Sequence, residues 1–182
     1  MDEILIIGHS YVRDLKIRSG GFINNARCKF LYLPGSCFRH YDEHFFTRIS
    51  RRGSYKYVFV VLGGNSLVRD LDFRMMREEI TTFYELLNLS FSNSKIVPIE
   101  VEMRFYKEDN KWDALPEDKF KIVRNALNRF IRTAKFGHHY LQIGGPSRMD
   151  NADFYKSDGV HLNNLGLDKY ISLISNFLDS LN

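Results

Sequence analysis

Short apolar stretches, most of them ending at glycine, alternate along the chain with longer amphipathic stretches, and this alternation constrains the fold most strongly. The stretches that favour strands are residues 4–7, 29–33, 55–62, 95–101 and 140–143. Their nearly continuous apolar character is typical of strands covered on both faces. Strands that alternate with helices predict an α/β fold with a central parallel sheet of about five strands, covered by helices on both sides.

Between these strands, large apolar residues recur at the spacing of a helix face. The residues on these stripes are Phe38, Tyr41, Phe45 and Ile49; Met76, Ile80, Phe83 and Leu87; Phe120, Val123, Leu127, Ile131 and Ala134; and Leu167, Tyr170, Ile174 and Leu178. We interpret them as core-facing sides of helices rather than as cofactor contacts. Pro116 favours the start of the third helix, and Gly137 is placed to end it.

The chain has 182 residues, of which 44% are hydrophobic and 26% charged. These proportions favour one folded domain over residues 1–182 and argue against disorder. The first residues lead directly into a strand, without a secretory signal pattern, and no apolar stretch is long enough to span a membrane. We therefore expect an intracellular, cytoplasmic protein.

Ligands of open parallel sheets bind beyond the carboxyl ends of the strands. In this chain, the segments that follow the strands are residues 8–11, 34–36, 63–66, 101–115 and 144–161. The irregular segment 102–115 should overhang the site, either as a lid or as a solvated loop. Its aromatic residues Phe105, Tyr106 and Trp112, together with His9 and Gly64, are candidates to line a substrate.

Ser10 follows the first strand in the segment Gly8-His9-Ser10 and precedes a helix. At a helix N-terminus, its backbone N–H and the helix dipole would face a negative charge formed nearby, as a nucleophilic serine requires. Serine is also a favoured helix cap, and the same pattern occurs for that structural reason alone.

The third strand ends in Gly63-Gly64-Asn65-Ser66. Paired glycines let the backbone approach a ligand closely, and the Asn65 amide could donate a hydrogen bond to an oxyanion. A glycine-rich strand exit with asparagine capping the next turn is the structural alternative.

Asp158 and His161 lie three residues apart on a turn before the last helix. A carboxylate bonded to one ring nitrogen of histidine fixes the tautomer and leaves the other nitrogen free to accept a proton. A surface turn that contains an unrelated histidine is the alternative.

Taken together, these segments resemble the SGNH (GDSL-like) hydrolase family in order and position over nearly the whole chain, and DGVHLNNLG is the most specific match. The resemblance implies a flavodoxin-like three-layer αβα sandwich and a serine esterase that needs no cofactor. It also implies a catalytic triad of Ser10, His161 and Asp158. The implied oxyanion donors are the Ser10 N–H, the Gly35 N–H and the Asn65 side chain.

Two positions depart from the family pattern, because His9 and Ser66 stand where aspartate is usual. Neither position belongs to the implied triad. The string GHSYVRDL resembles the esterase domains encoded in the first reading frame of animal non-LTR retrotransposons. That resemblance implies an ester or lipid substrate and association with nucleic acid or a membrane.

Charge and the remaining polar residues leave further alternatives. Residues 1–57 hold ten basic and five acidic residues. The chief rival hypothesis is therefore a catalytically weak SGNH-like interaction module that contacts nucleic acid or a membrane through a basic face. A third possibility is a nucleic-acid-binding protein whose RNA binding depends on Arg48, Arg51 and Arg52. No metal site is expected, because His40 and His44 are spaced as helical ligands but lack a third. Ser36 and Ser66 are weaker nucleophile candidates, since neither is expected at a helix N-terminus like that of Ser10.

Overall fold

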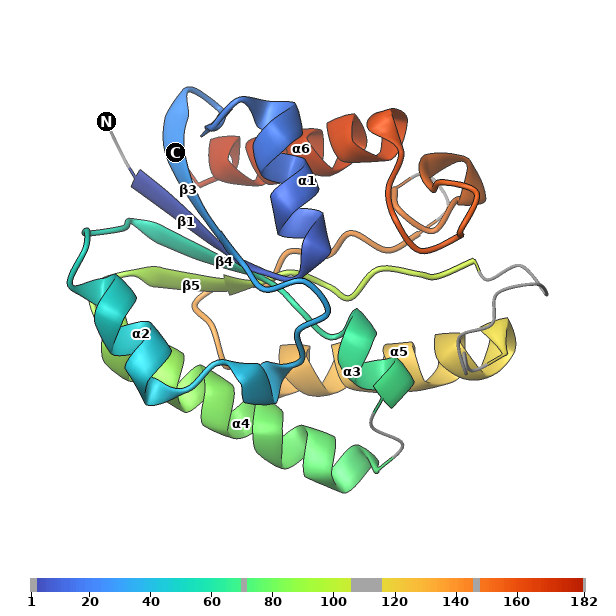
Figure 1. Ribbon diagram of the computed structural model, residues 1–182, viewed down its shortest axis with the longest axis horizontal. Coiled ribbons are helices and arrows are strands. Elements are labelled where there is room, and N and C mark those ends of the chain that lie inside the picture. The colour runs from blue at the N-terminus through green and yellow to red at the C-terminus, as the bar shows by residue number, and fades with distance from the viewer. Residues whose placement is uncertain (1–2, 70–71, 106–115, 146–147, 182) are drawn as a thin grey trace.

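The computed structural model describes residues 3–69, 72–105, 116–145 and 148–181 (Figure 1). Its sheet contains parallel strands β1 (Glu3–Gly8), β3 (Ala26–Tyr32), β4 (Tyr57–Val61) and β5 (Lys95–Pro98). The short strand β2 (Phe22–Ile23) pairs antiparallel with β3 at one edge, which gives the order β2-β3-β1-β4-β5. The predicted α/β class with a mostly parallel sheet of five strands is confirmed.

Helices cover both faces of this sheet, as Figure 1 shows. On one face lie α1 (Ser10–Ser19) and α6 (Asn164–Asp179), and on the other lie α2 (Glu43–Ser50), α3 (Gly64–Arg69), α4 (Phe73–Ser90) and α5 (Glu117–Ala134). Two short 3-10 helices, η1 (Phe38–His40) and η2 (Ala152–Phe154), lie in the connections.

Residues of β1 alternate between the two cores, which shows how an unbroken apolar strand is used. Ile4 and Ile6 pack on the side of α1 and α6, whereas Leu5 and Ile7 pack on the side of α2, α4 and α5. Both sets are almost completely buried. A strand covered on both faces needs apolar residues at every position, as expected for a three-layer arrangement.

The predicted strand over 140–143 is wrong, because this segment makes only a single bridge between Ile99 and Leu141. A side chain takes the place of the strand ladder: Glu100 Oε2 accepts hydrogen bonds from the N–H groups of Ile143 (2.9 Å) and Gly144 (2.5 Å). The strand expected over 95–101 ends early, at Pro98.

The single helix predicted from the stripe Phe38–Ile49 is also wrong. The chain forms η1, leaves helical geometry at Tyr41, and starts again as α2, where Asp42 Oδ1 accepts the Phe45 N–H at 2.8 Å. An aspartate N-cap of this kind begins a new helix. His40 and His44 therefore do not share one helix face.

The other predicted helices are confirmed, but α5 ends differently from the expectation. Its last turn closes at Lys135, which has a left-handed φ of 53°, and not at Gly137. Gly137 has a different role, because a Cβ there would lie 2.5 Å from the Ile96 carbonyl oxygen. Close packing against β5 therefore explains this glycine.

Arg48, Arg51 and Arg52 are exposed at the end of α2, shortly before β4 begins. This places them toward the amino ends of the strands, whereas Ser10 follows the carboxyl end of β1. Among the helices in the described ranges, none is long and apolar enough to cross a membrane.

Candidate active site

Ser10 is the first residue of α1, and the preceding residue, not Ser10, caps the helix. His9 occupies the N-cap, and its Nδ1 accepts the Tyr11 N–H at 3.4 Å. The alternative interpretation of Ser10 as a structural cap is therefore wrong. Its hydroxyl instead faces a histidine from the other end of the chain, with 3.4 Å between Ser10 Oγ and His161 Nε2. Such a long contact is common before a substrate binds.

Asp158 holds the His161 ring in one orientation. Its Oδ2 lies 2.7 Å from His161 Nδ1, and its Oδ1 accepts the backbone N–H groups of Val160 (2.8 Å) and His161 (2.9 Å). A carboxylate has only acceptors, so Nδ1 must carry the ring proton. The unprotonated Nε2 then faces Ser10.

The same contacts govern the charge of Asp158. Partial burial raises its pKa, but the backbone and ring N–H groups of His161 and the Val160 N–H outweigh this and lower the pKa below its ordinary value. Asp158 is therefore ionised at neutral pH, as a group that stabilises a histidine cation must be.

The turn that carries His161 is joined to both neighbouring segments. The Gly159 carbonyl accepts the Phe105 N–H at 2.7 Å, and the Tyr11 hydroxyl donates to the Val160 carbonyl. Gly159 has a φ of +66°, a conformation that favours glycine. Because Tyr11 follows Ser10 directly, this contact ties the His161 turn to the helix that carries the hydroxyl.

Asn65 contacts the turn that follows β3. Gly35 has a φ of +70° and precedes Ser36, whose carbonyl accepts a hydrogen bond from Asn65 Nδ2 at 3.1 Å. An amide nitrogen carries two protons, so Asn65 retains a second N–H for a ligand. The Ser10 N–H belongs to the first turn of α1, where backbone amides have no acceptor within the helix.

Sequence reasoning missed Arg104, which lies at the end of the extended segment after β5. Its side chain is largely buried, and Nη2 donates to Asn65 Oδ1 at 2.8 Å. Gly64 is buried beneath it, since a Cβ there would lie 2.9 Å from Nη2. The one available signal was a single positive charge in the segment Val101–Phe105. In the sequence alone, this arginine cannot be told apart from an exposed one.

His9 is buried, with 2% of its surface exposed, and its Nε2 has no partner among the described residues. Burial, followed by the charges of Arg104 and His161, lowers its pKa to about 3. His9 is therefore neutral at ordinary pH. The sequence offered no orienting partner for this ring, and the structure supplies one in the Tyr11 N–H.

The remaining candidates from the sequence are Phe105, Tyr106, Trp112 and Ser66. Phe105 is partly buried, with its ring 5.1 Å from that of Tyr155, and Tyr106 and Trp112 lie outside the described residues. Ser66 does lie at the start of a helix, α3, contrary to expectation, but its hydroxyl is fully buried. Within the part of the chain that the structure describes, no three histidine, cysteine, aspartate or glutamate residues are grouped as metal ligands.

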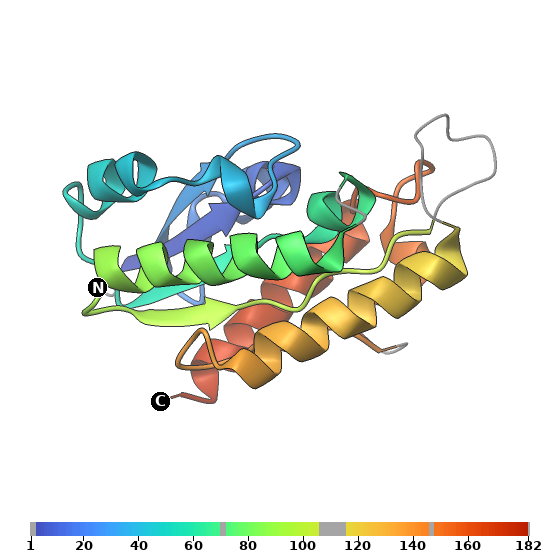
Figure 2. The same ribbon diagram turned by 90° about the horizontal axis from the view of Figure 1, so that it is seen from below.

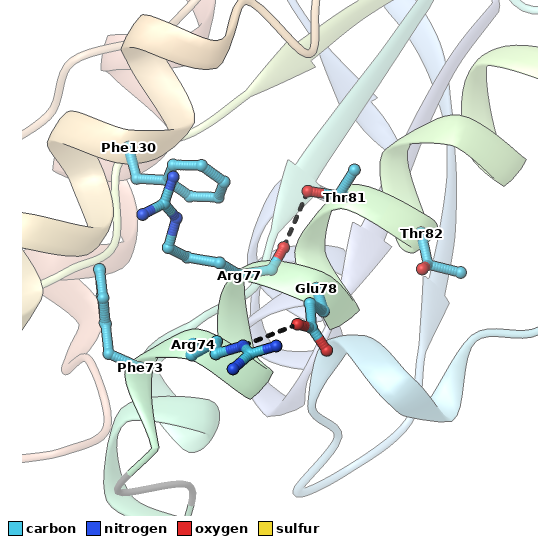
Figure 3. Close-up of a pocket in the computed structure, with 7 residues that line it drawn as sticks. All are labelled: Phe73, Arg74, Arg77, Glu78, Thr81, Thr82 and Phe130. Atoms are coloured by element: carbon cyan, nitrogen blue, oxygen red, sulfur yellow. Dashed lines mark hydrogen bonds and ion pairs between the residues drawn. The ribbon is translucent and has the colours of Figure 1, made fainter.

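A separate pocket of about 540 Å³ lies between α4 and α5 (Figure 3). The residues that line it are Phe73, Arg74, Arg77, Glu78, Thr81, Thr82 and Phe130. Arg77 lies over the Phe130 ring at 4.5 Å, and Arg74 Nε donates to Glu78 at 3.3 Å. In Figure 2, these two helices lie side by side on the face of the sheet that α1 does not cover. The described residues that line this pocket include no histidine.

No family model and no curated protein matches the sequence. Solved structures do match its fold. A GDSL-like lipase from Bacteroides thetaiotaomicron superposes with a TM-score of 0.71 at 14% identity, over 100% of this chain and 89% of that one. A carbohydrate esterase of family 3 from Talaromyces cellulolyticus gives 0.67 at 13% identity, over 100% and 98%. A Slackia heliotrinireducens protein assigned to the SGNH hydrolases gives 0.72 at 13%, over 97% and 98%. The fold is thus the one seen in SGNH-type hydrolases and esterases.

Proposed function

We propose that this protein is a serine esterase of the SGNH type, which hydrolyses a carboxylic ester through an acyl-enzyme on Ser10. The observation that carries the proposal is the chain of contacts from Ser10 Oγ to His161 Nε2 (3.4 Å) and from His161 Nδ1 to Asp158 Oδ2 (2.7 Å). A hydroxyl, a base and an orienting carboxylate in this order are the requirements of nucleophilic acyl transfer.

In the proposed reaction, His161 Nε2 takes the Ser10 proton while Ser10 Oγ forms a bond to the ester carbonyl carbon. His161 then gives this proton to the leaving alkoxide as the ester C–O bond breaks, which leaves the acyl group on Ser10. Water, deprotonated by His161, attacks the acyl-enzyme and releases the carboxylic acid and free Ser10. Asp158 stays ionised throughout and stabilises the transient histidine cation.

The oxyanion formed in each half-reaction would be held by the Ser10 N–H, the Gly35 N–H and the second N–H of Asn65. Donors fixed in advance at this position stabilise the charge that develops in the transition state. The contact from Asn65 to the Ser36 carbonyl supports this assignment, because it holds the amide beside the turn that carries Gly35.

The substrate class extends the same proposal. The ester would carry an acetyl group, a short acyl group or a lipid chain, and the string GHSYVRDL favours a retrotransposon-type esterase. Purified protein should hydrolyse nitrophenyl acetate and butyrate, and Ser10→Ala should lower kcat by about 10³-fold or more. Ser66→Ala, which removes the buried alternative hydroxyl, is the matched control and should retain activity. Equal, slow hydrolysis by wild type and Ser10→Ala would contradict the proposal.

Binding of RNA or an anionic membrane through Arg48, Arg51 and Arg52 is the alternative, favoured by their exposure near one another at the end of α2. Such binding would weaken with salt, and replacing all three arginines by glutamine should abolish it. Ester hydrolysis should be unchanged in that variant. No binding by the wild type at low salt would remove this alternative.

A further inference from the structure

Arg104 carries a positive charge in the protein interior, where burial of a charge costs free energy. Only 8% of its surface is exposed, and it follows the buried residues Val101, Glu102 and Met103. Transfer of a charged group from water into a protein interior costs several kcal/mol unless the group is paired and hydrogen-bonded. A buried guanidinium therefore implies contacts that hold it there.

One of these contacts fixes the orientation of the Asn65 amide. Arg104 Nη2 donates to Asn65 Oδ1 at 2.8 Å, and Asn65 Nδ2 donates to the Ser36 carbonyl at 3.1 Å. If the amide were turned over, its NH₂ would face a guanidinium that can only donate, and its oxygen would face a carbonyl that can only accept. Arg104 therefore holds the Asn65 amide in one orientation, with Oδ1 toward the guanidinium and Nδ2 toward the Ser36 carbonyl.

The absence of a side chain at Gly64 leaves room for this contact. A Cβ on Gly64 would lie 2.9 Å from Nη2 and 3.3 Å from Nε of Arg104. The guanidinium thus crosses the first turn of α3 directly over Gly64, and it also lies 5.9 Å from the Phe120 ring centre. A side chain at position 64 would therefore displace the guanidinium from this position.

The next residue links the same segment to the catalytic base. The Phe105 N–H donates to the Gly159 carbonyl at 2.7 Å, within the turn between Asp158 and His161. Consecutive residues thus hold the two sides of the site: Arg104 holds the oxyanion donor, and Phe105 holds the turn of the base.

We propose that Arg104 is a positioning residue for ester hydrolysis, which acts by holding the Asn65 amide so that its second N–H points to the oxyanion. This inference depends on the proposed function. A cation hydrogen-bonded to the amide oxygen also polarises the amide and strengthens its N–H as a donor. Because the oxyanion forms only in the transition state, loss of Arg104 should lower kcat more than it raises KM.

A double-mutant cycle of Arg104→Met, Asn65→Ala and the combined variant tests this inference on nitrophenyl acetate. Arg104→Met should lower kcat by about 10-fold to 100-fold, with KM changed less than threefold. If Arg104 acts through Asn65, the combined variant should be no slower than Asn65→Ala alone. Arg104→Lys, which keeps a positively charged donor group, should recover part of the loss. Arg77→Met, at an exposed arginine in the pocket of Figure 3 that lies over the Phe130 ring, is the control and should match the wild type.

Gly64→Ala gives an independent test if Arg104→Met folds poorly, because it displaces the guanidinium without removing its charge. It should also lower kcat at least tenfold, with a melting temperature close to that of the wild type. Two results would overturn the inference. One is a loss of kcat in the combined variant equal to the product of the two single losses. The other is activity of both Arg104→Met and Gly64→Ala within twofold of wild type. Hydrolysis that does not depend on Ser10 would instead refute the proposed function itself.

Discussion

The proposed site has two sides, the base and the oxyanion donors, and they are built in different ways. On the side of the base, Asp158 and His161 are three residues apart, and the backbone between them supplies two of the hydrogen bonds that fix the carboxylate. On the oxyanion side, Asn65 is held by Ser36 and Arg104, which come from segments far apart in the chain. The base side is thus largely local, whereas the oxyanion side depends on the completed fold.

This difference predicts unequal responses to substitution. Local hydrogen bonds in the turn should keep the Asp158–His161 geometry even if distant packing changes. The oxyanion side should lose its geometry when any one of its three segments moves.

The largest effect is expected on the base side. In Asp158→Asn, the amide NH₂ would face His161 Nδ1, so the ring proton would move to Nε2, which could no longer accept the Ser10 proton. We expect kcat to fall by about 10⁴-fold, as it does in serine hydrolases that lose the orienting carboxylate. Steady-state hydrolysis of nitrophenyl acetate measures this. Asp153→Asn, on exposed η2, is the matched control, and a loss below tenfold in Asp158→Asn would show that the carboxylate does not set the tautomer.

A smaller loss is expected on the oxyanion side. Asn65→Ala removes one of three donors, and loss of one such donor lowers kcat by about 10²-fold to 10³-fold. The fold should survive, since Asn65 is only partly buried. Kinetics and thermal unfolding of Asn65→Ala, with the exposed Asn125→Ala as control, measure both quantities. An unchanged kcat would exclude Asn65 from the oxyanion site.

His9 directly precedes Ser10, and its ionisation should affect stability. Its pKa is about 3 in the folded protein, against an ordinary value near 6.5 in the unfolded chain. The unfolded chain therefore binds the proton first, and stability should fall as pH decreases from about 6.5 toward 3, by up to about 1.4 kcal/mol per pH unit.

Urea unfolding at pH 7.5, 6 and 5 measures this slope, and His9→Asn should flatten it. Asparagine stays neutral and can still accept the Tyr11 N–H at the N-cap. His139 also has a pKa lowered by burial, but it is present in both proteins and cancels in the comparison. Equal slopes in the two proteins would mean that His9 is solvated and can be protonated in the folded state.

The smallest effect is expected far from both sides. Lys135→Gly relieves a left-handed conformation and should raise the free energy of unfolding by about 0.5–1 kcal/mol. Arg132→Gly, inside α5, should lower it by about 1 kcal/mol. Neither should change kcat. Loss of activity in Lys135→Gly would show that the site is coupled to the end of α5.

The sequence predicted most fully those features that local pattern determines. The strands β1, β3 and β4 and the helices α4 and α6 follow from unbroken apolar runs or stripes. The turn of Asp158 and His161 follows from short-range spacing. The strand over 140–143 failed because Glu100, a side chain from another segment, takes the backbone N–H groups that a neighbouring strand would use.

The other failures have one local and one long-range cause. Asp42 interrupts the predicted helix over 38–49 with a cap that the apolar stripe does not reveal. Arg104 has no local signal at all, because its role depends on Asn65 and on the missing side chain of Gly64. A residue of this kind can be found only after the fold has brought the segments together.

Direct trapping of the acyl-enzyme tests the central claim about Ser10. Protein mixed with nitrophenyl acetate and quenched in acid within the first turnovers should carry one acetyl group on the peptide that contains Ser10. The same peptide from Asp158→Asn should acquire it far more slowly, and Ser10→Ala should carry none. Acetylation at another residue that persists in Ser10→Ala, or turnover without any acetylated intermediate at Ser10, would contradict the account.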